Sequence, residues 1–202
     1  MKMTLDKKVD WTKSLPKDSG TEELFQEFKE KAEALTVKVI NVKTAAEAEA
    51  SILKEITEEK AKIVCAVKSM ELVNIQNIQE KAKKSGVDFS LEIDRDIIEK
   101  AQIGISEFDL GIADLGTIVQ DADDVQKRLV STLPPIHIAV LQKKAIVDTL
   151  QSSLEVINKT YNGNPSNFIA YVTGPSKTSD IERVLTIGVH GPGKLIVVVI
   201  DQ

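Results

Sequence analysis

Apolar positions recur along this chain at two spacings, one typical of helices and the other of strands. Two capping boxes, Ser19 with Glu22 and Thr44 with Glu47, each precede an apolar stripe of helical spacing. From these signals we expect helices at about 21–35, 44–56, 75–85, 95–101, 125–129 and 147–161, and strands at 37–42, 63–67, 89–93, 136–141, 168–172 and 195–200. Four of the six strands are followed at once by a helix, so the elements largely alternate.

This alternation predicts an α/β fold, in which a largely parallel sheet carries helices on both faces and the crossovers are right-handed. Between residues 103 and 120 the pattern changes to closely spaced short strands interrupted by three glycines, which predicts a hairpin-like excursion. The apolar runs at 168–172 and 195–200 indicate buried strands.

Length favours a single domain. A chain of 202 residues is long enough for one α/β core and short for two ordinary domains. Residues 1–20 are polar and contain Pro16 and Gly20, so we expect an N-terminal arm followed by one domain over 21–202. Trp11 of the arm is expected to pack either on this domain or on a second subunit.

Charge and cysteine content exclude several classes of protein. A net charge of −5 argues against a general nucleic-acid binder, which needs a concentrated basic face. We find no apolar run near the roughly 18 residues of a membrane span, and the first residues lack the apolar core of a secretory signal. Because Cys65 is the only cysteine, no intrachain disulfide can form, and a cytoplasmic location without a membrane span is expected.

Polar loops bounded by glycine interrupt the apolar pattern near the end of the chain, at 174–180 and 188–191. If a helix begins near Ser179, then the loop amides, two hydroxyl groups and the Lys177 ammonium would converge on one phosphate or carboxylate. The alternative is a turn and a helix cap, with Lys177 in solvent. The ligand-binding candidates in these loops are Gly174, Ser176, Lys177, Thr178, Asp180 and Gly191.

Both histidines of the chain are candidates for the site. His190 lies between glycines that permit close backbone approach, and we take it as a candidate acid or base. His137 lies within an expected strand, where it acts either as a ligand contact or as a hydrogen-bonded structural residue. The spacing of the histidines is not that of a metal site, so no metal is expected.

Four ordered segments resemble a known family. GIADLGTIV, LPPIHIAVL, GPSKTSDIE and GVHGPGKL are similar to signatures of the LUD-domain family, from about Ile103 to the end of the chain. The chain departs from the family pattern with Asp114-Leu115 in place of Glu-Thr, Lys177 in place of Arg and Ser179 in place of Ala. The resemblance implies a fold similar to the ribose-5-phosphate isomerase and CoA-transferase-like group.

The resemblance also identifies Asp114, Gly116 and Thr117 as the acidic-glycine-threonine turn of the family. A carboxylate at such a position acts as a base or ligand anchor, or caps the turn through its own backbone. Asp114 is therefore the second candidate catalytic residue, and Gly116 and Thr117 join the candidate ligand-binding residues.

By resemblance, the chain is expected to be an accessory subunit of a system that oxidises L-lactate to pyruvate, with iron–sulfur redox subunits as partners. One cysteine cannot supply the four thiolates that a cluster generally needs, and no flavin or nicotinamide fingerprint is present, so no cofactor is expected. Whether the chain is catalytic by itself is open.

Two alternatives remain. One is a stand-alone enzyme for a small phosphorylated or CoA-linked substrate, in which Lys177 holds the anion and Asp114 or His190 transfers a proton. The other is a scaffold with the same fold and no ligand.

Overall fold

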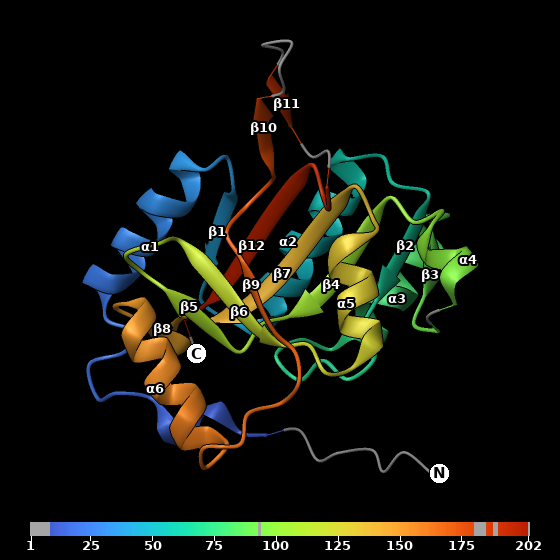
Figure 1. Cartoon of the computed structure of the whole chain (residues 1–202). Coiled ribbons are helices and arrows are strands. Elements are labelled where there is room, and N and C mark those ends of the chain that lie inside the picture. The colour runs from blue at the N-terminus through green and yellow to red at the C-terminus, as the bar shows by residue number, and fades with distance from the viewer. Residues whose placement is uncertain (1–8, 93, 180–184, 188–189, 202) are drawn as a thin grey trace.

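The computed structural model describes residues 9–92, 94–179, 185–187 and 190–201, with the backbone alone for 177–179 and 185–187. A six-stranded sheet forms the centre of the molecule, and all its strands are parallel (Figure 1). The order across this sheet is β1 (Lys38–Val42), β12 (Lys194–Ile200), β7 (Ile136–Gln142), β4 (Ile103–Glu107), β2 (Ile63–Ala66) and β3 (Asp88–Ser90). The parallel α/β fold expected from the alternation is confirmed.

Helices lie on both faces of this sheet (Figure 1). The helical elements of the described residues are η1 (Trp11–Ser14), α1 (Glu22–Ala34), α2 (Ala45–Glu58), α3 (Ile75–Lys84), α4 (Arg95–Ile98), α5 (Val125–Thr132), η2 (Lys143–Ala145) and α6 (Leu150–Thr160). α2 and α3 cover one face, whereas α1, α5 and a second sheet lie on the other. None of the helices in this described part is both long and apolar enough to cross a membrane.

The second sheet has four strands, in the order β8 (Ile146–Val147), β5 (Leu110–Ile112), β6 (Thr117–Asp121) and β9 (Ile169–Val172). β5 and β6 form the hairpin expected between residues 103 and 120. Aliphatic side chains of β12 alternate between the two cores, since Ile196 and Val198 pack toward α2 while Val197 and Val199 pack toward the second sheet and α1.

Several expected boundaries were wrong. Thr21, not Ser19, caps α1, because its side chain accepts from the Leu24 amide, while the Ser19 hydroxyl donates to the Pro16 carbonyl. α6 begins at Leu150 instead of 147, since Ile146–Val147 pairs with β5 as a strand.

Two strands also differ from expectation. β3 ends at Ser90, whose hydroxyl donates to the Glu92 carbonyl and accepts from the Glu92 amide, so that the chain turns away from the sheet. The run 168–172 is not a buried strand. β9 lies at the edge of its sheet, and Phe168 and Tyr171 beside and within it are 51% and 39% exposed.

Trp11 packs on its own chain. It is 4% exposed, and its ring meets the ring of Tyr161 edge-on at 5.7 Å between centroids. The arm residues 9–20 thereby lie against α6 and the second sheet, and the amide of Gly20 donates to the carbonyl of Ile146.

Gly116 joins the β5–β6 turn to α1. Its φ is +61°, and an added Cβ would lie 2.4 Å from the backbone nitrogen of Ala32. Gly86 offers a matched control, because its φ is +82° and nothing lies within 4 Å of an added Cβ.

We therefore expect Gly86→Ala to cost only the backbone strain of about 1–2 kcal/mol. Gly116→Ala should cost about 1–3 kcal/mol more, because helix α1 and the turn must also move apart. Urea unfolding of both variants and the parent at neutral pH measures the difference. Equal losses in the two variants would show that the turn does not depend on close contact with α1.

Candidate functional site

The segment expected to open a helix forms a β-hairpin instead. β10 (Lys177–Ser179) pairs antiparallel with β11 (Leu185–Ile187), so no helix begins near Ser179. The anion site expected at a helix N-terminus therefore lacks its helix. Lys177 and Thr178 contribute backbone to β10, and Asp180 lies outside the described residues.

The described parts of the two glycine-bounded loops lie side by side. At the base of the hairpin the His190 amide donates to the Ser176 hydroxyl oxygen at 3.3 Å. His190 and Gly191 are exposed and lead toward the start of β12. Gly174 packs against the junction of α1 and β1, where an added Cβ would lie 3.1 Å from Val37 Cγ2. Both loops therefore lie at the amino ends of the parallel strands.

The β5–β6 turn reaches the same region. The hydroxyl oxygens of Thr117 and Thr173 lie 3.0 Å apart, and Gly116 in this turn packs on the last turns of α1. One carboxylate oxygen of Asp114, Oδ1, is buried and has no hydrogen-bond partner among the described residues. The structure thus gathers Gly116, Thr117, Gly174, Ser176, His190 and Gly191 around the α1–β1 junction and the hairpin base.

His137 does not join this group. It is 0% exposed, its Nε2 lies 2.9 Å from the Ser106 hydroxyl oxygen, and its ring contacts Phe108 with centroids 5.6 Å apart. A serine hydroxyl beside a histidine nitrogen is the geometry of an activated nucleophile. Here both side chains are enclosed, since Ser106 is also 0% exposed.

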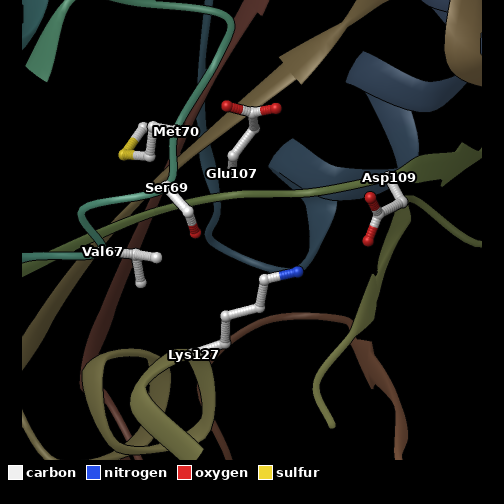
Figure 2. A pocket seen from close by; sticks show the side chains of 6 residues that line it. All are labelled: Val67, Ser69, Met70, Glu107, Asp109 and Lys127. Carbon is white, nitrogen blue, oxygen red and sulfur yellow. The ribbon is translucent and has the colours of Figure 1, made fainter. Parts of the chain in front are cut away.

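Two hollows lie at the opposite end of the parallel strands, near the carboxyl ends of β2 and β4. The smaller, of about 10 Å³, has room for about one water molecule. Figure 2 shows the Lys127 side chain extending into it, toward the side that holds Glu107 and Asp109. Lys127 Nζ donates to the Asp121 carbonyl at 2.9 Å. The lining residues are Val67, Ser69, Met70, Glu107, Asp109 and Lys127.

The larger hollow has a volume of about 150 Å³ and combines aromatic walls with carboxylates. Glu107 Oε2 accepts from the amides of Glu71 and Leu72, at 2.6 and 3.0 Å. The lining residues are Val9, Asp10, Trp11, Thr12, Glu71, Leu72, Glu107, Phe108, Asp109, Gln142 and Ala145.

Our sequence reasoning missed this end of the strands. The signal that was available is the position of Glu107, Phe108 and Asp109 directly after a buried strand. In open α/β sheets, ligands usually bind outside the carboxyl ends of the strands.

Burial lowers the pKa of His137 to about 3. The folded protein therefore keeps this ring neutral while the unfolded chain takes up a proton below its ordinary pKa of about 6.5. Stability from this source is complete above about pH 6.5 and declines as the pH falls from there toward 3.

We expect this difference to cost about 2 kcal/mol of unfolding free energy between pH 7.5 and pH 5. Urea titrations of the parent and of His137→Gln at both pH values isolate it, because the variant lacks the titrating ring. The same loss on acidification in both proteins would mean that His137 is protonated in the folded state.

Comparisons with known proteins place this geometry in a family. The LUD domain family model matches residues 25–200. "Lactate utilization protein C" of Macrococcus caseolyticus is 38% identical over 109 residues, covering 52% of this chain and 47% of the relative. The protein of the same name from Bacillus licheniformis is 40% identical over 107 residues, covering 52% and 44%. The chain spans about half the length of the curated relatives it matches.

A crystal structure of a DUF162 family protein from Deinococcus radiodurans superposes on 89% of this chain and 97% of its own, with a TM-score of 0.63. At 20% identity this likeness shows the fold alone. Because the family model extends from α1 to the end of β12, this chain belongs to the LUD domain family.

Proposed function

We propose that this chain is an accessory subunit of a system that oxidises L-lactate to pyruvate, and that iron–sulfur partner proteins carry the redox centres. The observation that carries this proposal is the state of Cys65. This only cysteine is 0% exposed, and burial raises its thiol pKa to about 12. A cluster needs thiolate ligands, generally four, and these residues do not supply them, so the proposal places the redox centres in partner chains. The link to lactate oxidation comes from the relatives that are named for lactate utilization.

The β10–β11 hairpin is the element that we assign to partner binding. It extends beyond the rest of the fold and forms a two-stranded sheet of its own (Figure 1). An isolated hairpin is only marginally stable in water, and open strand edges readily pair with another chain. Docking on a partner would supply the missing neighbours.

The hairpin base is the proposed anion site. Backbone amides, the Ser176 hydroxyl and the Lys177 ammonium are the groups that would bind a small carboxylate or phosphate there. His190 and Asp114 remain the candidates for proton transfer beside such a ligand, with Gly116 and Thr117 supporting the loop.

A stand-alone enzyme for phosphorylated or CoA-linked substrates has less support. The larger hollow at the carboxyl ends of the strands is lined by Asp10, Glu71, Glu107 and Asp109, with no lysine or arginine among its described lining residues. An anionic substrate would therefore meet no cationic side chain among these lining residues, at the end of the strands where α/β enzymes usually bind ligands.

The accessory role predicts specific co-purification. A tagged full-length chain expressed in its native cell, grown on L-lactate, should retrieve proteins that contain iron and give iron–sulfur electron paramagnetic resonance signals. Replacement of residues 177–187 by a two-residue Asn-Gly turn should abolish this retrieval, because it removes the assigned contact. Leu154→Ser, which changes the exposed face of α6, is the matched control and should retain it. If the parent chain retrieves no cluster-bearing protein, the accessory role is wrong.

The anion site predicts a role for Lys177, the only cation between residues 174 and 180. Lys177→Ala should weaken anion binding about ten- to hundredfold, through loss of a charge-assisted hydrogen bond worth roughly 1.5–3 kcal/mol. Thermal-shift titrations with phosphate, lactate, pyruvate and CoA measure it, because a ligand that binds only the native state raises Tm. Lys84→Ala at the end of α3 is the control and should behave like the parent. Equal shifts in all three proteins, or none in the parent, would remove Lys177 from any site.

A further inference from the structure

A polar cluster of three side chains links the two sheets in the interior. Ser106 lies on β4 and His137 on β7 of the six-stranded sheet, whereas Gln120 lies on β6 of the second sheet. All three are 0% exposed. Such a cluster is costly unless each polar atom finds a partner.

The directions of its hydrogen bonds follow from the chemistry of Gln120. Its Nε2 donates to the Glu107 carbonyl at 2.6 Å, and this acceptor determines which way the amide faces. The same Nε2 lies 3.3 Å from the Ser106 hydroxyl oxygen, which accepts from it. Gln120 Nε2 can only donate, so of the two partners of the Ser106 hydroxyl only His137 Nε2, 2.9 Å away, can accept its proton.

This order determines the tautomer of the histidine. Because Nε2 accepts from Ser106, the proton of the neutral ring resides on Nδ1. His137 Nδ1 is buried and has no hydrogen-bond partner among the described residues. Gln120 Oε1 is in the same situation. The cluster therefore has one unused donor and one unused acceptor.

Unused buried groups of this kind are rare. More than about 90% of buried polar groups in proteins have a partner, and each one without a partner costs about 1–3 kcal/mol. We infer that the Ser106–His137–Gln120 cluster is an internal water site, in which bound water accepts from His137 Nδ1–H and donates to Gln120 Oε1.

Water fits these two atoms better than other guests do. One of these atoms needs an acceptor and the other a donor, and water supplies both, since buried waters commonly make about three hydrogen bonds. A charged guest would lose its hydration without a charged partner, since the cluster itself contains only neutral side chains. Among the described residues no three histidine, cysteine, aspartate or glutamate side chains are placed to hold a metal ion.

Phe108 supplies the barrier between this water and the outside. Its ring contacts the His137 ring on one side, and the residue lines the larger hollow on the other. Since Phe108 is 3% exposed, the bound water exchanges slowly with bulk solvent.

Nuclear magnetic resonance of the unmodified full chain tests the inference. The chain has two histidines, so loss of one set of ring signals in His190→Gln assigns the other set to His137. Long-range proton–nitrogen correlation should show the Nδ1–H tautomer. The Nδ1–H proton should also give a cross-peak to water whose signs in nuclear Overhauser and rotating-frame spectra are opposite, as for a bound water and unlike proton exchange.

Either of two results would overturn the inference. One is an Nε2–H ring, which leaves Nδ1 as an acceptor and removes the unused donor. The other is an Nδ1–H proton with no dipolar cross-peak to water. Neither result depends on a variant of the cluster, so a loss of folding in such a variant cannot obscure the answer.

Discussion

The position of the last strand constrains the whole molecule. β12 lies between β1 and β7, with five parallel residue pairs to the first and seven to the second. It thus joins the beginning of the domain to its middle, and α1, α2 and the second sheet all depend on its two apolar faces. Strands buried on both faces must be apolar throughout, which accounts for the uninterrupted run Leu195–Ile200. The position of β12 also fixes the base of the hairpin, because Gly191 lies shortly before β12 begins at Lys194.

Periodicity was sufficient to predict most of the central sheet. Helices and strands from α1 to α3 follow from capping residues and apolar spacing, and the parallel arrangement follows from their alternation. Strand order did not follow, since nothing local in the sequence says that β12 pairs with β1. The second sheet was not expected as a separate sheet, although its β5–β6 hairpin and a strand at 168–172 were. Its two-residue strand β8 is too short to carry a period and exists only because it pairs with β5, far earlier in the chain.

The candidate site was likewise predicted only in part from the sequence. Gly174, Ser176 and His190 could be grouped from the sequence because both glycine-bounded loops lie between the last two expected strands, 168–172 and 195–200. Interpreting 177–179 as part of a helix N-terminus was wrong, because Lys177, Thr178 and Ser179 pair across to β11 instead. Three residues that include Thr178 and Ser179 are compatible with either a helix cap or a short hairpin strand, so the sequence alone could not separate the two. His137 was open between two roles, and its full burial and its contact with Ser106 support the hydrogen-bonded structural one.

Burial also bears on what kind of protein this fold supports. Ser106, His137 and Cys65 belong to residue types that often serve as nucleophile or base, and all three are enclosed at 0% exposure, whereas His190 is exposed. Burial keeps the thiol protonated and the imidazole neutral, so neither is prepared to react with a solute. The accessible features are instead a projecting ribbon, a loop pair at its base and an acid-lined hollow at the other end of the strands. A two-stranded ribbon with open edges is suited to pairing with another chain, which supports the proposed role of a subunit that binds a partner.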